Sequence, residues 1–305
     1  MAVVYLNGRY VQAERAKVSA FDRGFSYGDG LFETMRAYAG FVFALDRHVA
    51  RLWEGAVQIG ISFENDVGKW QQVMSELLRR NRLTDADASL RLTVTRGADV
   101  LGSLLPPAVP ISPTLLLVAR PLDTGIATRQ QIGMSAITVH WGSPFNPLQI
   151  KSLDYLYNML AMVQAQREGA HEALFVDRNG YMIEGATSNL FSCSKGVLTT
   201  PPLSAGLLPG ITRDIMIDLA KQEGLTVSEA PVHLDNILTA DEAFLTGSLK
   251  EIMPLIALDD RQIGIGSAGP VTQHLQGCYR AAVEKERTRD TRTSALRAPV
   301  RGVNS

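Results

Sequence analysis

Lys151 is the residue with the clearest chemical potential, because it lies between a predicted strand and a predicted helix and has apolar neighbours. Ile150 precedes it and Leu153 follows two positions later. A lysine amine among apolar side chains has a lowered pKa, since its charged form is poorly solvated. The uncharged amine is the form that condenses with a carbonyl to give a Schiff base. Judged by position alone, the alternative is a loop lysine that faces solvent.

Glu184 is a candidate acid. It ends the apolar segment Tyr181–Glu184, directly before Gly185. A carboxylate in this position is expected to be partly buried and to need a cationic partner. Such an acid can keep a pyridine nitrogen protonated, and the protonated ring then withdraws electrons from a substrate bound to it. The alternative is a carboxylate at the end of a hairpin in contact with water.

Two turns of small residues and one arginine are candidates for binding an anion. The segment 207–213 runs into a predicted helix, whose first N–H groups and Thr212 hydroxyl can bind phosphate oxygens. The turn 246–249 follows a predicted strand and can complete the cup. Arg51, on a predicted helix that begins at Asp46, can supply a fixed positive charge. Taken singly, each has an ordinary explanation as a capped helix, a turn or a surface arginine.

A lysine, an acid, an anion cup and a fixed cation together are what pyridoxal 5'-phosphate requires, so we predict this cofactor. No metal is predicted, because Cys193 and Cys278 are far apart in the chain and lack CxxC or HxxxH spacing. Both cysteines are expected to be reduced, buried thiols that are not metal ligands, as in proteins of the cytoplasm.

Composition narrows the class of protein. The chain has 305 residues and a formal net charge of -1. Its length predicts two domains, and its near-neutral charge gives no support for binding to nucleic acid or to an acidic membrane surface. The first residues, MAVVYLNGRY, lack the pattern of a signal peptide, and no apolar run reaches the roughly 18 residues of a membrane span. We therefore expect a cytoplasmic protein.

The alternation of apolar and polar residues predicts the elements that position these side chains. In a small N-terminal α/β domain, residues 1–120, we expect hairpins, two helices and two further strands. Its Pro-rich loop 97–113 is a candidate lid or specificity loop. After a polar linker, residues 121–131, a larger C-terminal domain covers residues 132–287. The tail 288–305 is polar and is expected to be disordered.

Four predicted elements of the C-terminal domain place the candidate residues. A strand over 132–141 and a helix over 156–167 lie before and after Lys151. A hairpin over 172–184 ends at Glu184. A helix over 212–223 begins at the anion cup, and the last helix of the chain is predicted over 271–287.

Six motifs occur in this order along the chain: DRGFSYGDGLFETMR, LDRHVARL, IKSLDYLYNMLA, GYMIEGATSNLF, TPPLSAGLLPGITRD and FLTGSLKEIMP. The series resembles the class IV aminotransferases, which are the fold-type IV pyridoxal-phosphate enzymes. They include branched-chain aminotransferase, D-amino acid aminotransferase and aminodeoxychorismate lyase. The resemblance covers residues 3–285. It implies an α/β (α+β) fold of two domains, with the cofactor between the small N-terminal domain and a larger C-terminal pseudo-barrel. It also implies a homodimer, in which the partner's N-terminal domain closes the substrate pocket.

The resemblance also implies roles for individual residues. Lys151 forms the Schiff base and moves the proton between the substrate Cα and the cofactor, and Glu184 pairs with the pyridine nitrogen. The implied cofactor-binding set is Arg51, Lys151, Glu184, Thr187, Ser188, Asn189, Leu208, Ile211, Thr212, Ser248 and Leu249. The positions that resemble a substrate pocket are Phe25, Tyr27, Phe32, Arg36 and Arg91. Either arginine can bind a carboxylate when glutamate is the amino donor.

These motifs leave the reaction open. We predict first a transaminase that moves an amino group between a branched-chain or other hydrophobic amino acid and a 2-keto acid, since several pocket positions are apolar. The alternative is aminodeoxychorismate lyase, which releases pyruvate and 4-aminobenzoate in folate synthesis. The runs GDGLFET, IKSL and PPLSAGLLPGITR resemble that enzyme more closely. The loop 95–103 lacks the Arg-x-His pair of D-amino acid aminotransferases. A protein that binds the cofactor without catalysis is a third hypothesis.

Overall fold

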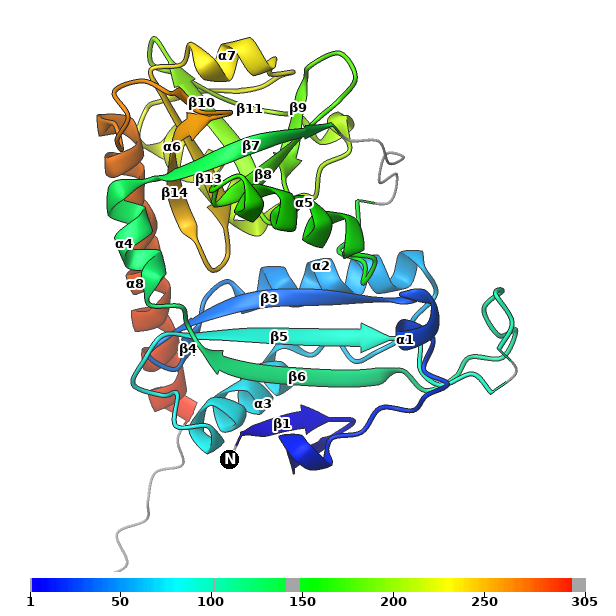
Figure 1. The fold of residues 1–305 in the computed structure, drawn as a ribbon. Helices are drawn as coiled ribbons and strands as arrows, with labels where there is room; N and C mark the ends of the chain where they lie inside the picture. Colours follow the sequence, from blue (N-terminus) through cyan, green and yellow to red (C-terminus); the bar gives the residue numbers. More distant parts are fainter. Residues whose placement is uncertain (1, 101, 141–148, 298–305) are drawn as a thin grey trace, which may run out of the picture.

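Two domains, each built on one sheet, make up the fold (Figure 1). The computed structural model describes residues 2–100, 102–140 and 149–297. The N-terminal sheet has six antiparallel strands in the order β2-β1-β6-β5-β3-β4. Its strands are β1 (Val3–Leu6), β2 (Arg9–Gln12), β3 (Gly30–Tyr38), β4 (Phe41–Val42), β5 (Ala88–Thr95) and β6 (Thr114–Pro121).

Helices α2 (Leu45–Gln58) and α3 (Val67–Arg80) pack on this sheet and share its hydrophobic core. Along β5 the side chains that face the core recur at every second position, as a strand with one buried face requires. These residues are Ala88, Leu90, Leu92 and Val94. The short helix α1 (Arg23–Tyr27) and a 3-10 turn at Ala13–Arg15 complete the domain.

The C-terminal sheet has nine strands, and it curls so that β9 returns to lie beside β10. Its order is β12-β11-β10-β13-β14-β7-β8-β9, with β15 beside β14. Parallel pairing joins β7 to both β8 and β14, and joins β11 to β12. The strands are β7 (Met134–His140), β8 (Glu172–Val176), β9 (Met182–Gly185), β10 (Asn189–Ser194), β11 (Val197–Thr200), β12 (Thr226–Glu229), β13 (Glu242–Gly247), β14 (Glu251–Leu258) and β15 (Arg261–Gln262).

The C-terminal domain also contains the helices α5 (Leu156–Arg167), α6 (Ile211–Gln222) and α7 (Leu234–Leu238). α5 begins shortly after Lys151 and packs on β8, and α6 begins at the predicted anion cup. α7 and a 3-10 turn at Leu203–Ala205 are shorter. None of the helices in the described part of the chain combines the length and the apolarity needed to cross a bilayer.

Two further helices connect the domains. α4 (Gly125–Ile132) forms within the segment expected to be a polar linker, and α8 (Pro270–Arg297) runs along both domains (Figure 1). The prediction that the chain is disordered from residue 288 is wrong for 288–297, because these residues continue α8. Residues 298–305 lie outside the described residues.

Contacts with the N-terminal domain explain why α8 extends beyond the apolar pattern. Glu286 of α8 accepts a hydrogen bond from the N–H of Ala44 at 3.0 Å. One helical turn later, Asp290 accepts from Gln71 Nε2 at 2.6 Å. At these two positions, polar side chains of α8 are bound by the neighbouring domain, which favours the helix there without a hydrophobic face.

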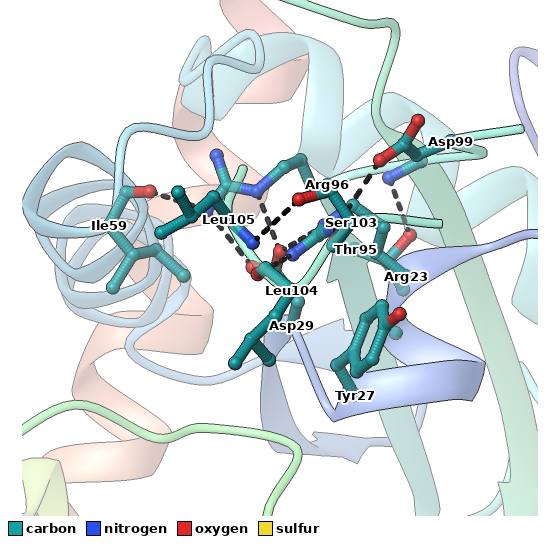
Figure 2. A network of polar contacts seen from close by, with 12 residues as sticks. Arg23, Tyr27, Asp29, Ile59, Thr95, Arg96, Asp99, Ser103, Leu104 and Leu105 are labelled. Atoms are coloured by element: carbon teal, nitrogen blue, oxygen red, sulfur yellow. Dashed lines mark hydrogen bonds and ion pairs between the residues drawn. The ribbon is translucent and has the colours of Figure 1, made fainter. Parts of the chain in front are cut away.

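The loop 97–113 is anchored by a buried arginine of α1 (Figure 2). Arg23 is 3% exposed and donates to the carbonyl oxygens of Ser103 at 2.6 Å and Leu104 at 2.9 Å. It also forms an ion pair with Asp29 at 2.7 Å, which raises the pKa of Arg23. The first part of the loop is thus held to α1, and its role as a lid or specificity loop stays a prediction.

Candidate active site

A cavity of about 800 Å³ lies between the two domains, a volume typical of small-molecule sites. Strands β3 and β5 and helix α2 contribute to it from the N-terminal domain, and the remaining walls come from the C-terminal domain. Every residue of the predicted cofactor-binding set lines this cavity, together with Phe32 and Arg91 of the predicted substrate set. Motifs scattered over the chain therefore converge on one site, while their individual roles stay predictions.

Lys151 is positioned by a short extended segment that pairs with the start of β3. The N–H of Phe32 donates to the Lys151 carbonyl at 3.0 Å, and the N–H of Leu153 donates to the Gly30 carbonyl at 3.0 Å. The Lys151 amine lies 4.7 Å from the centroid of the Phe32 ring. Burial, together with the positive charge of Arg51, lowers the pKa of Lys151 to about 8. The expected amine of depressed pKa is confirmed.

Tyr155 is a residue of this site that sequence reasoning did not single out. Its hydroxyl accepts a hydrogen bond from Lys151 Nζ at 3.3 Å and donates to the Ala186 carbonyl at 3.2 Å. Burial, with the nearby charge of Glu184, raises the pKa of Tyr155 to about 12, so it remains a neutral phenol. The available signal is an aromatic residue with a polar tip, four positions after the lysine and at the start of α5.

Glu184 lies on β9 and is held by two residues that also line the cavity. Its carboxylate accepts hydrogen bonds from the N–H of Leu208 at 3.1 Å and from Asn189 Nδ2 at 3.2 Å. Burial raises the pKa of Glu184 to about 8, because the charged form is poorly solvated there. A cationic ring nitrogen would favour the charged form again. Gly210 is required nearby, since a Cβ at that position would lie 1.9 Å from Asn189 Oδ1.

Arg51 is held by a buried pair of side chains that sequence reasoning missed. Its guanidinium donates two hydrogen bonds of 2.7 Å to Glu33 and a third, also of 2.7 Å, to the Pro209 carbonyl. His48 Nδ1 lies 2.7 Å from the same carboxylate. Burial alone would raise the pKa of Glu33, but Arg51 and His48 outweigh it and lower the pKa to about 2. An acid inside an apolar strand is the signal that could have found it.

Helix α6 begins at the cavity wall and presents donors there. Gly210 caps it without a side chain, and the first N–H groups, those of Ile211 and Thr212, have no partner within the helix. Among the described residues, the buried hydroxyl of Thr246 also lacks a hydrogen-bond partner. These donors, beside the guanidinium of Arg51, suit an anion such as phosphate. The residues present therefore fit a phosphorylated pyridine cofactor.

A model of the family described as amino-transferase class IV matches residues 30–258 of the chain. The chain belongs to the class IV aminotransferases. It is therefore an enzyme of that family, and the predicted two-domain α/β fold is confirmed by the solved structures that it resembles.

Relatives of this class IV aminotransferase carry more than one activity in their names. A protein of Methanocaldococcus jannaschii, provisionally named a branched-chain-amino-acid aminotransferase, is 41% identical over 294 residues, which are 95% of this chain and 96% of the relative. The aminodeoxychorismate lyase of Bacillus subtilis is 32% identical over 282 residues, 92% of this chain and 95% of the relative. A solved branched-chain amino acid aminotransferase from T.th., with pyridoxamine 5'-phosphate, is 31% identical, with a TM-score of 0.83, and the match covers 92% of this chain and 94% of that chain.

Arg36, which the motifs assign to the substrate pocket, is not among the residues that line the cavity of this class IV aminotransferase. It forms ion pairs with Asp87 at 2.7 Å and Glu251 at 3.0 Å, and it donates to the Leu249 carbonyl at 3.0 Å. Tyr38 also donates to Glu251, at 2.7 Å. Glu251 has a φ of 56°, a left-handed conformation that side chains rarely adopt. Arg36 therefore fixes the turn before β14, because its charge is already engaged there.

Phe25 and Tyr27, the other two pocket positions implied by the motifs, also lie outside the cavity of the single chain. Both belong to α1, where the side chain of Phe25 is 82% exposed. The Tyr27 hydroxyl donates to the Gly102 carbonyl at 2.8 Å, which ties α1 to the loop 97–113. Within one chain these two residues form part of an outer surface.

Thr187 and Ser188 line the cavity, but their hydroxyl groups are directed to a buried acid. Glu172, which is 0% exposed, accepts from Thr187 at 2.8 Å and from Ser188 at 3.2 Å. The ammonium of Lys250 binds the same carboxylate and donates to the Thr187 hydroxyl at 2.7 Å. Lys250 is thus a second lysine of the cavity, one that is paired with an acid and that sequence reasoning missed.

Proposed function

We propose that this class IV aminotransferase is a pyridoxal-phosphate-dependent transaminase. It would move an amino group between a hydrophobic amino acid, such as a branched-chain one, and a 2-keto acid. One observation carries the proposal: the amine of Lys151, the carboxylate of Glu184 and the start of α6 all line one cavity. The predicted cytoplasmic location is also a proposal, supported by the free thiols of Cys193 and Cys278.

The residues of the cavity divide the work. When bound, pyridoxal phosphate supplies an aldehyde for an amine and a ring that delocalises the electron pair left as the substrate Cα loses its proton. Lys151 would be the base that takes this proton, since a pKa of about 8 leaves part of the amine uncharged near neutral pH. Tyr155 would orient the Lys151 amine, and Asn189 would hold Glu184 against the ring nitrogen.

The experiment that tests this function is a half-reaction. L-leucine alone, added to the yellow holoenzyme, should convert the cofactor to its colourless aminated form, and 2-ketoglutarate should restore the colour. Absorbance spectra follow both steps. A lyase would give neither change efficiently and would instead release pyruvate from aminodeoxychorismate. That second function is retained because the B. subtilis lyase is 32% identical over most of its length.

Arg91 is the residue that we propose binds an acidic substrate. Its guanidinium lies 3.5 Å from the centroid of the Phe32 ring, and no ion pair joins it to an acid within the described residues. Burial lowers the pKa of Arg91, because its charged form is poorly solvated there. A carboxylate that entered the cavity would stabilise this charge and would itself be bound. Phe32, Ile150 and Tyr155 offer the apolar contacts that a hydrophobic side chain needs. One cavity would thus accept both glutamate and a branched-chain amino acid.

Replacing Arg91 with glutamine is expected to raise KM for glutamate about 10- to 100-fold, the cost of a hydrogen bond to a charged group. KM for leucine should change less than about threefold, because its side chain makes apolar contacts. Steady-state kinetics with each donor measure both values. Arg178→Gln is the matched control, since Arg178 also lines the cavity. Equal losses with both donors in Arg91→Gln would contradict the assignment.

We further propose that the enzyme is a homodimer whose contact surface includes α1, the loop 97–113 and the start of α5. Phe25, Leu104 and Leu105 are exposed on the first two of these, and Leu156 and Leu160 are exposed on α5. Exposed apolar groups of this density mark interaction sites. In such a dimer, Phe25 and Tyr27 could reach the partner's cavity, as the resemblance implies.

The double variant Phe25→Asp/Leu105→Asp is therefore expected to sediment as a monomer, because two buried charges oppose association. Its activity should fall with the loss of the dimer. Sedimentation velocity and turnover are the two measurements. Ile265→Asp is the matched control, since Ile265 is similarly exposed but lies in the C-terminal domain, outside the proposed contact surface. A wild-type protein that sediments as an active monomer would refute the dimer.

A further inference from the structure

A second cluster of chemistry-bearing side chains lies away from the cavity, where α8 packs against α6. His274 and Cys278 are four residues apart on α8, so they share one face of that helix. Glu223 is the C-cap residue of α6 and directly follows its last residue, Gln222. The ligand atoms of these three side chains all lie within 4.8 Å of one another. None of the three lines the cavity.

One distance between the donor atoms agrees with that around a tetrahedral metal ion, and a second is shorter. His274 Nε2 lies 3.6 Å from Cys278 Sγ and 2.8 Å from Glu223 Oε2. Ordinary zinc bond lengths place an imidazole nitrogen and a thiolate sulfur roughly 3.5 Å apart, and a nitrogen and a carboxylate oxygen roughly 3.4 Å apart. The nitrogen–sulfur distance already agrees. The nitrogen–oxygen distance must open by roughly half an ångström, which the exposed side chain of Glu223 permits by rotation.

We propose that Glu223, His274 and Cys278 form a binding site for a divalent cation of borderline softness, for which zinc is the best fit. One nitrogen, one sulfur and one oxygen ligand suit zinc, whereas magnesium and calcium take oxygen ligands. Water would complete the coordination, because Glu223 and His274 are exposed. The carbonyl groups at the end of α6 carry partial negative charge, which also favours a cation there.

From the sequence alone, Cys278 is expected not to be a metal ligand. Its HxxxC spacing with His274 supplies only two donors, and Glu223 lies 51 residues before His274. The packing of α6 on α8 brings the third donor into place. The site would therefore join the end of α6, whose other end forms the anion cup, to the helix that runs along both domains.

Metal binding at this site must displace protons. The thiol proton of Cys278 leaves to water as the sulfur–metal bond forms. The proton that His274 Nε2 shares with Glu223 leaves to water or moves to Nδ1, and that hydrogen bond is replaced by a nitrogen–metal and an oxygen–metal bond. A thiol must lose its proton before the sulfur can bind zinc, so protons compete with the metal. Zinc affinity is accordingly expected to rise with pH.

The test uses the full-length holoenzyme without an affinity tag and zinc chloride as the probe, in competition with a chromophoric zinc chelator. We expect one competing zinc per chain in the wild type. Cys278→Ser and His274→Asn should each lower the affinity by at least about tenfold. His233→Asn is the matched control, because His233 forms a similar pair with Asp235, at 3.3 Å, without a cysteine beside it. Its affinity should equal that of the wild type.

Alkylation of the thiols provides a second readout. Iodoacetamide should modify Cys278 more slowly when zinc is present, and magnesium should give no protection. Cys193, which is buried, is the internal reference in the same digest. Zinc that binds equally well to wild type and Cys278→Ser would overturn the proposal, as would a wild type that retains no zinc beyond that of the two variants.

Discussion

Lys151→Ala is expected to lose at least about four orders of magnitude in turnover, because both the covalent attachment of the cofactor and the main proton transfer are removed. The cofactor should still bind, since the start of α6 and Arg51 remain to hold its phosphate. Turnover and cofactor content are measured on the same preparation. Full activity in Lys151→Ala would refute the mechanism.

Lys250 gives this experiment a matched control inside the same cavity. Its ammonium is bound by the buried carboxylate of Glu172, so it is not available to form a Schiff base. Among the described side chains, the amine of Lys151 forms no ion pair, and its hydrogen bond is to the neutral Tyr155 hydroxyl. Lys250→Ala should retain a yellow cofactor and much of its turnover. Reduction of the wild type with borohydride, followed by peptide mapping, should place the cofactor on the peptide that contains Lys151. A label on the Lys250 peptide would reverse the assignment of the two lysines.

Glu184→Gln is expected to slow the amino acid half-reaction by about 10²- to 10³-fold, the range for loss of one preorganised electrostatic contact. Glutamine can still accept the hydrogen bond from the N–H of Leu208, so the loop should stay in place. What is lost is the negative charge that would keep the ring nitrogen protonated. Cofactor affinity should change less than about tenfold, since the phosphate contacts are untouched.

Rapid-mixing absorbance gives the half-reaction rate of Glu184→Gln, and equilibrium titration gives the cofactor affinity. Glu172→Gln is the matched control, because Glu172 is also a buried acid near the cavity but is already paired with Lys250. Its half-reaction rate should fall far less. An unchanged rate in Glu184→Gln would remove this residue from the mechanism.

Local sequence patterns were enough to predict the properties of Lys151 and of the anion cup. The apolar neighbours of Lys151 were enough to predict an amine of lowered pKa, since burial of the flanking residues follows from strand and helix periodicity. The anion cup followed from the start of one helix, whose free N–H groups are a property of every helix end. Lys151, Glu184 and the anion cup are therefore predictable from local patterns, whereas Thr187, Ser188, Asn189 and Leu208 are implied only by the resemblance to the family.

Only the tertiary structure decided which side chains of different elements meet. Glu33 holds Arg51 from a different element, and Arg36 is engaged by Glu251, which lies more than two hundred positions later in the chain. Nothing in the sequence near Arg36 distinguishes a substrate contact from a structural ion pair. In both cases the arginine binds a carboxylate, which belongs either to the substrate or to another residue of the chain. The same holds for α8, where Asp290 in the polar part of the helix is bound by Gln71 of the N-terminal domain. Periodicity records the burial of one element, whereas pairing between distant charges depends on how the elements pack.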